Sequence, residues 1–210
     1  MANWLLADEL ANGADAGFWA FLDPRQAFWD RKKPDRVLAN ATRLVLREQQ
    51  RNPDAIRDFA ALYATPLPGA ATSATRPDPT ILNRVVVPAA EFATAVASQI
   101  SRLTKAAIQP RDIVVVTLAG RERSALLTLP SFGPHRAVRA DADDAAANLV
   151  ADTFLRFKGL ERPFVIVVIE GPKSQYDARM HIALTRATVG ATIVTSPEDL
   201  ELDPRLRALA

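Results

Sequence analysis

The sequence predicts an α/β protein whose helices flank a mostly parallel sheet. Residues 112–118 and 164–170 are almost continuously apolar, as in strands that are buried on both faces. Segments with apolar residues at helical spacing, such as 89–105, alternate with these runs. We therefore expect a doubly wound sheet, and in such sheets ligands are bound at the carboxyl ends of the strands.

The first third of the chain is expected to hold a strand, a helix and a connector. The aromatic run 17–22 predicts a buried strand that ends at the turn Asp23–Pro24. A helix is expected from Asn52–Pro53 to about Tyr63, because proline is tolerated in a first turn. Prolines among small residues then predict an irregular connector at about 64–80.

The later part of the chain is expected to alternate strands and helices. In the helix at 89–105, Phe92, Val96, Ile100 and Leu103 share one apolar face. The expected strands are at 84–88, 112–118, 150–153, 164–170 and 191–195, and the expected helices at 89–105, 121–129 and 177–188.

Composition excludes several kinds of chemistry. The chain has 210 residues, 49% of them hydrophobic, which is enough for one large domain or two small lobes. It has no cysteine and two histidines, so disulfides, thiolate metal sites and cysteine nucleophiles are excluded. No metal site of its own is expected. Neither a long apolar run nor a signal peptide is evident, and a cytoplasmic protein is the expectation.

Charge gives an ambiguous signal for nucleic-acid binding. The chain has 26 basic and 24 acidic residues, a balance too close to neutral to indicate nucleic acid by itself. A run of basic residues from Arg25 to Arg57 nevertheless includes the aromatic pair Phe28 and Trp29. Such a segment suits a single strand, whose bases stack on rings while cations follow phosphates. It also suits a solvated basic face beside two core aromatics.

Four short segments follow one another in an informative order: Asp23–Gln26, Gln50–Asn52, Lys158–Glu161 and Ala183–Ala187. In this order they resemble motifs III, IV, V and VI of the UvrD/Rep-like superfamily 1 DNA helicases. The resemblance spans nearly the whole chain. It implies a RecA-like second lobe over residues 36–210, preceded at 1–35 by a remnant of the first lobe.

The resemblance implies that three residues respond to the nucleotide. Gln26 would sense the γ-phosphate, Arg51 would contact it, and Arg186 would act as an arginine finger. An arginine fork fits a phosphate in a bidentate manner, and an arginine finger neutralises charge on the transferring phosphoryl group. The alternatives are a surface glutamine at Gln26 and a capping or ion-paired residue at Arg186. Arg43 and Arg47 lie nearby in the sequence and are alternative candidates for the role given to Arg51.

The resemblance assigns Lys158, Gly159 and Glu161 to the nucleotide as well. Lys158 would pair with phosphate, and Glu161 would accept a hydrogen bond from ribose or water. Gly159 permits a tight backbone turn between them. The alternative is an exposed lysine–glutamate pair in a loop.

For nucleic acid, the resemblance implies single-stranded DNA contacts at Phe28, Trp29 and Thr153. Stacking of a base on a ring contributes about 1–3 kcal/mol in single-strand binders. The alternative is core packing, at least for one of the two rings. The chain has Leu155 where relatives often have histidine, which puts one DNA or coupling contact in doubt.

A phosphate-binding loop of the form Gly-x-x-x-x-Gly-Lys-Ser/Thr does not occur in the sequence. Residues 171–174, Gly-Pro-Lys-Ser, lack its earlier glycine, and the proline removes an amide donor. ATP and Mg²⁺ are therefore expected only together with the missing N-terminal ATPase lobe, in cis or in trans. Alone, the chain is expected to show no ATPase activity, weak salt-sensitive affinity for single-stranded DNA and possible self-association. The alternative function is a non-catalytic interaction module derived from a helicase lobe.

Overall fold

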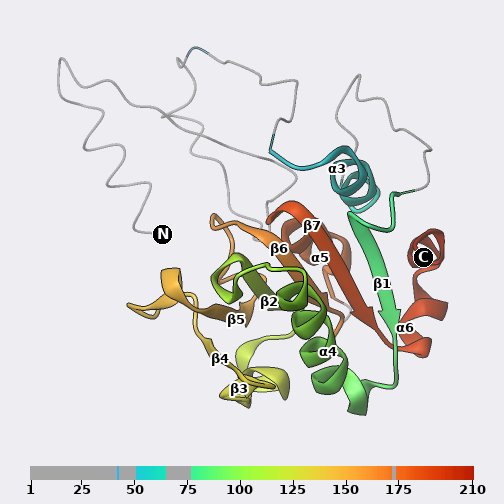
Figure 1. The fold of residues 1–210 in the computed structure, drawn as a ribbon. Coiled ribbons are helices and arrows are strands. Elements are labelled where there is room, and N and C mark those ends of the chain that lie inside the picture. Colours follow the sequence, from blue (N-terminus) through green and yellow to red (C-terminus); the bar gives the residue numbers. More distant parts are fainter. Residues whose placement is uncertain (1–41, 43–50, 65–76, 172–173) are drawn as a thin grey trace, which may run out of the picture. The chain divides into compact units, whose positions relative to one another are not determined.

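A computed structural model describes residues 42, 51–64, 77–171 and 174–210 (Figure 1). Apart from residue 42, these residues belong to one compact unit, Gln50–Ala210. Gln26, Phe28 and Trp29 lie outside the described residues, as do the expected strand at 17–22 and most of the expected connector. The part of the chain that is described contains no helix long and apolar enough to cross a membrane.

A seven-stranded, mostly parallel sheet forms the centre of this unit (Figure 1), which confirms the expected fold class. The strand order is β1-β7-β6-β2-β5-β4-β3, and every neighbouring pair is parallel except β3 and β4. The strands are β1 (Leu82–Val86), β2 (Ile113–Thr117), β3 (Ser131–Phe132), β4 (His135–Val138), β5 (Leu149–Thr153), β6 (Arg162–Val168) and β7 (Ala187–Thr195).

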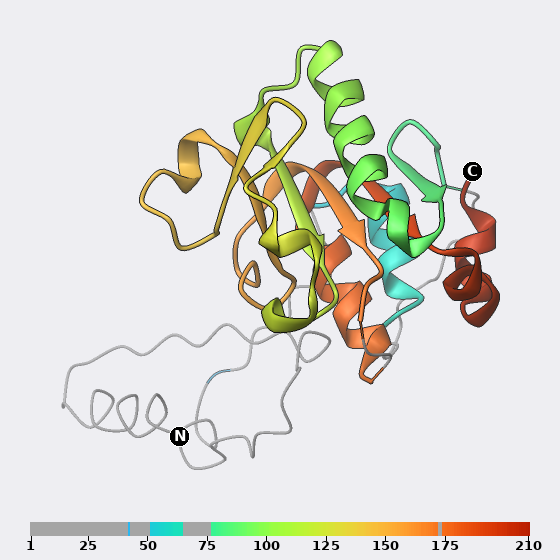
Figure 2. The ribbon, with the colours of Figure 1, turned by 90° about the horizontal axis from the view of Figure 1, so that it is seen from below.

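Helices cover both faces of the sheet (Figure 2). On one face, Ile113 and Val115 of β2 belong to the core cluster that contains the apolar side of α4. Successive strand residues point to opposite faces, so Val114 and Val116 face the layer of α3 and α5. The α-helices are α3 (Asp54–Ala61), α4 (Phe92–Lys105), α5 (Tyr176–Leu184) and α6 (Pro197–Leu202), and short 3-10 turns lie at 89–91, 110–112, 121–123, 126–128, 145–147 and 204–208.

Three expected elements differ from the structure. The first strand after the connector is β1, which begins two residues earlier than expected. The helix expected at 177–188 is α5, which ends at Leu184, so β7 begins four residues earlier than expected. The prediction of a helix at 121–129 is wrong, because this segment forms two 3-10 turns.

A carboxylate just after β6 explains the irregular path of residues 121–128. The Glu170 carboxylate accepts hydrogen bonds from the Ser124 hydroxyl at 2.5 Å and from the Ala125 amide at 2.9 Å. It also accepts one from the Thr117 hydroxyl at 3.0 Å. These bonds connect the loop after β2 to the end of β6. Residues 121–128 cannot make them while forming a regular helix.

The turn after β6 leads to a first prediction, because Gly171 has little room for a side chain. Its φ is +94°, and a Cβ placed there lies 2.7 Å from the Ala119 Cβ. Replacing Gly171 with alanine is expected to lower the free energy of unfolding by at least about 2 kcal/mol, through left-handed strain and overlap. Urea unfolding measures this loss. Gly120 is the control, since a Cβ at that residue would meet nothing within 4 Å; equal effects of the two substitutions would contradict the prediction.

Candidate functional site

Three predicted site residues that are far apart in sequence come together at the amino ends of β6 and β7. The Arg51 Nε lies 3.6 Å from the Glu161 Oε2, and an Arg51 Nη2 donates to the Thr185 carbonyl at 3.1 Å. Arg186 follows Thr185, and its Nη1 donates to the Leu160 carbonyl at 3.4 Å. We call Arg51, Glu161 and Arg186 the amino-edge site.

Asn52 holds the parts of the amino-edge site together, a role that was not predicted from the sequence. It lies directly before the proline that opens α3, and only 5% of it is exposed. Its Nδ2 donates to the Thr185 carbonyl at 3.1 Å and to the Ala187 carbonyl at 2.6 Å. Asn52 thereby fixes the start of α3 against the segment between α5 and β7. In the sequence, Asn52 was marked only as the start of the expected helix and as the last residue of the segment Gln50–Asn52.

The Arg186 guanidinium faces acceptors inside the protein. Arg186 is 2% exposed. Its Nε donates to the Ile182 carbonyl at 3.0 Å, and its Nη2 donates to the Thr185 hydroxyl at 3.0 Å. The bond to the Leu160 carbonyl, at 3.4 Å, is longer than either of these. In this arrangement Arg186 joins the end of α5 to the loop that precedes β6.

The loop from β5 to β6 contains Lys158, Gly159 and Glu161, which are exposed. Gly159 has a φ of +90°, a conformation that L side chains rarely adopt, as expected for a tight turn. The exposed fractions of the Arg51 and Glu161 side chains are 39% and 52%. The ion pair between them is therefore accessible to solvent and to a ligand.

Thr153 lies at the carboxyl ends of the parallel strands, whereas the amino-edge site lies at their amino ends. It ends β5, is buried, and its hydroxyl accepts a hydrogen bond from the Arg156 amide at 3.2 Å. Because β5 and β6 each run parallel to β2, the loop 154–161 leads from the carboxyl ends of the strands back to their amino ends. Thr153 therefore lies at the carboxyl ends of the strands, where ligand residues were expected, whereas Arg51, Glu161 and Arg186 lie at the amino ends.

Charged residues also gather at the carboxyl ends of β2, β5 and β6. The fully buried Asp152 accepts from an Arg121 Nη2 at 3.1 Å and from the Ala140 amide at 3.0 Å. An Arg179 Nη1 donates to the Leu118 carbonyl at 2.5 Å. Burial lowers the pKa of Arg179, and the nearby charge of Arg123 lowers it further. We call Arg121, Arg123, Asp152 and Arg179 the carboxyl-edge cluster; sequence patterns did not predict it.

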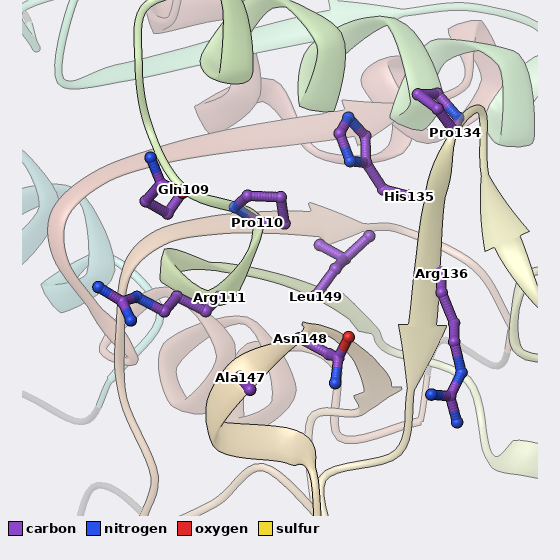
Figure 3. Close-up of a pocket in the computed structure, with 9 residues that line it drawn as sticks. All are labelled: Gln109, Pro110, Arg111, Pro134, His135, Arg136, Ala147, Asn148 and Leu149. Carbon is purple, nitrogen blue, oxygen red and sulfur yellow. The ribbon is translucent and has the colours of Figure 1, made fainter.

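A cavity of about 380 Å³ lies at the amino ends of β2, β4 and β5 (Figure 3). Its walls include Pro110, His135 and Leu149, and none of the predicted site residues line it. The guanidinium groups of Arg111 and Arg136 point away from each other (Figure 3), and Arg136 is paired with an Asp144 oxygen at 3.0 Å. The cavity therefore does not focus positive charge on a ligand.

Among the described residues, no group of three or more histidine, aspartate or glutamate side chains is arranged to hold a metal ion.

Comparisons with known proteins inform the fold. No protein-family model matches the sequence, and no curated protein matches it. The C-terminal domain of a possible DNA helicase from Lactobacillus plantarum WCFS1 is similar in structure, with a TM-score of 0.51 and 16% sequence identity. The match covers 76% of this chain and 93% of that domain. At this identity the likeness concerns the fold alone: the chain has the α/β fold of a helicase C-terminal domain.

Proposed function

We propose that the chain is the C-terminal part of an ATP-dependent superfamily 1 DNA helicase and that its amino-edge site contacts the nucleotide. One observation carries the proposal. Arg51 and Glu161 belong to segments more than a hundred residues apart, yet they meet beside Arg186 at one edge of the sheet. Gln26, the fourth residue in this proposal, lies outside the described residues. In this proposal an ATPase lobe, in cis or in trans, supplies the phosphate-binding loop.

The proposed nucleotide contacts follow from the chemistry of the exposed groups. When bound, Mg²⁺-ATP supplies the phosphoryl group that is transferred to water. The Arg51 fork binds γ-phosphate oxygens, and Lys158 adds positive charge. Glu161 accepts from a ribose hydroxyl, and Gly159 shapes the loop between them. Exchanging the solvent-accessible Arg51–Glu161 pair for these contacts costs little, because exposed ion pairs contribute only about 0–1 kcal/mol.

In this proposal, Arg186 acts as the arginine finger. Because Arg186 is 2% exposed, its guanidinium has to turn outward to reach a phosphoryl oxygen. The Leu160 carbonyl is the acceptor that we expect it to release, since this bond is longer than those to Ile182 and Thr185. The two shorter bonds would keep the group oriented.

Single-stranded DNA is the proposed polymer, and the carboxyl-edge cluster supplies positive charge for its phosphates. Arg123 is exposed there and its charge acts on Arg179, while Arg121 pairs with Asp152, the residue before Thr153 at the end of β5. Phe28 and Trp29 remain the proposed stacking residues. Weak binding by the chain alone is expected to fall steeply with salt, because each phosphate contact releases counterions.

ATP hydrolysis by the complete two-lobe motor tests the proposal. Replacing Arg51 with alanine is expected to lower kcat by roughly 10²–10³-fold, the effect of removing one donor from a developing negative charge. Arg57 is a matched control: it lies one turn into α3 and pairs with Asp54 and Asp58. Arg57→Ala is expected to keep the rate. Equal rates for wild type, R51A and R57A would overturn the proposed phosphate contact.

The burial of Arg186 favours one alternative function, a non-catalytic interaction module derived from a helicase lobe. In such a module, the motif residues hold the fold together and need no nucleotide. This alternative predicts that adding the ATPase lobe to the chain produces no DNA-stimulated hydrolysis. Hydrolysis that appears only in the mixture, and that depends on Arg51, would exclude it.

A further inference from the structure

A buried carboxylate lies at the far ends of the two helices that lead to the amino-edge site. Asp203 is 4% exposed. The Tyr63 hydroxyl donates to its Oδ2 at 2.7 Å, and the Arg205 Nε donates to its Oδ1 at 2.7 Å. Tyr176 also interacts with Asp203 by charge and hydrogen bonding. We call Tyr63, Tyr176, Asp203 and Arg205 the distal clamp.

Arg205 links the end of α3 to the start of α5. Its Nη1 donates to the Leu62 carbonyl at 3.1 Å, and its Nη2 lies 2.8 Å from the Asp177 Oδ1. Its guanidinium carbon stacks 3.9 Å from the centre of the Tyr63 ring. Arg205, which follows α6, therefore contacts both the end of α3 and the start of α5.

The two helices transmit this contact to the amino-edge site. α3 starts beside Asn52, and α5 ends beside Thr185, where the Asn52 amide donates to the Thr185 carbonyl. Between the two ends, the His181 Nδ1 lies 2.9 Å from the Ala60 carbonyl oxygen. The two helices are thus held together at the site by Asn52, between the centre of α5 and the last turn of α3 by His181, and at the far end by the distal clamp. An eight-residue helix spans only about 12 Å and behaves as one rigid piece.

We propose that Asp203 is a positioning residue, which sets the placement of Arg51 and Arg186 by fixing the far ends of α3 and α5. Its importance for catalysis rests on the proposed function, whereas its effect on the geometry of the amino-edge site does not. Loss of the Asp203 carboxylate would free α3 and α5 to shift against each other. The movement would then appear at Asn52 and Thr185.

The tyrosines give a direct optical signal of the distal clamp. The chain has two tyrosines, and both belong to the clamp. Burial raises the pKa of Tyr63 and of Tyr176 far above the usual value, and the charge of Asp203 adds to the increase. Arg205 opposes it at both tyrosines, whereas Asp199 adds to it at Tyr176.

We expect no tyrosinate absorbance from the folded protein near pH 10. The folded state keeps both phenolic protons, while the unfolded state loses them at about pH 10. The contribution of the tyrosines to stability is therefore fully present below about pH 10 and declines at higher pH. Absorbance at 295 nm during an alkaline titration measures this. Tyrosinate that forms near pH 10 in the folded wild type would contradict the distal clamp.

Hydrogen exchange of the full chain tests the positioning role. Asp203→Asn keeps the shape of the side chain and removes its charge. Exchange in peptides that cover 51–63 and 176–187 is expected to become about tenfold faster, because the bonds to a charged acceptor are weakened. Glu201→Gln is the matched control: it removes one charge from the same segment, where Glu201 forms an exposed ion pair with Arg207.

Gly171→Ala separates positioning from a general loss of stability, because the nearest atoms to the added Cβ belong to Ala119 and not to the distal clamp. Faster exchange in the two peptides with D203N, beyond that in G171A, supports the inference. An unchanged exchange rate there, together with a lowered tyrosine pKa, would overturn it. If D203N does not fold, Tyr63→Phe removes one bond to the same carboxylate and is judged by the same result. Failure of the proposed function leaves this exchange result unaffected, so the two failures are distinguishable.

Discussion

Replacing Asn52 with alanine is expected to lower the free energy of unfolding by about 2–4 kcal/mol. The Asn52 amide is buried and donates to the carbonyls of Thr185 and Ala187. Alanine removes both donors at once, and no water can easily replace them at a buried position. The loss is measured by urea unfolding at pH 7. Since Asn52 fixes the start of α3, the Arg51–Glu161 pair is expected to loosen as well.

Asn83 is the matched control for this experiment. Its Nδ2 donates to the Pro79 carbonyl at 3.1 Å in an exposed hydrogen bond. Asn83→Ala is expected to cost less than about 1 kcal/mol, because water can satisfy the freed carbonyl. A cost for N52A no larger than that for N83A would show that the link between α3 and the start of β7 does not hold the amino-edge site together.

Replacing Arg186 with lysine is expected to lower kcat of the complete motor by about 10³-fold or more, the range seen when an arginine finger is removed. A lysine ammonium is a point charge without the planar fork, and it cannot keep the bonds to Ile182 and Thr185 while facing a phosphoryl group. Steady-state ATP hydrolysis in the presence of single-stranded DNA measures the effect.

Arg162→Lys controls for the loss of an arginine at the same sheet edge. Arg162 starts β6, is half-buried, and its Nη2 donates to the Ala145 carbonyl at 2.7 Å. It has no part in the proposed nucleotide contacts, so R162K is expected to hydrolyse ATP at the wild-type rate. If R186K also keeps this rate but unfolds more easily, Arg186 is a structural residue and the interaction module becomes the better function.

Much of the fold was predictable, because the signals that define it are local. The apolar runs of β2 and β6 and the helical spacing of α4 each identify one element, whichever partners it packs against. The hairpin β3–β4 was missed because Ser131–Phe132 and His135–Val138 are too short to show a pattern. The end of α5 was misplaced because Thr185, which interrupts it, is also compatible with a helix.

The site was predictable only as a set of candidate residues. Arg51, Glu161 and Arg186 were identified through the resemblance to helicase motifs, and the structure brings them together. Asn52 and Asp203 were not identified, because their bonds join residues more than a hundred positions apart and leave no periodic pattern. The general rule for parallel sheets pointed to the carboxyl ends of the strands, whereas the structure places Glu161 and Arg186 directly before β6 and β7, at their amino ends.

Photochemical labelling of the complete motor with an ATP analogue that carries an aryl azide on its γ-phosphate tests the central claim most directly. The proposed function predicts that DNA-dependent labelling of this chain occurs in peptides that contain Arg51, the loop 158–161 or Arg186. Excess ATP should prevent the labelling. Labelling confined to the carboxyl-edge cluster, or to the ATPase lobe alone, would contradict the claim that the amino ends of β6 and β7 face the γ-phosphate.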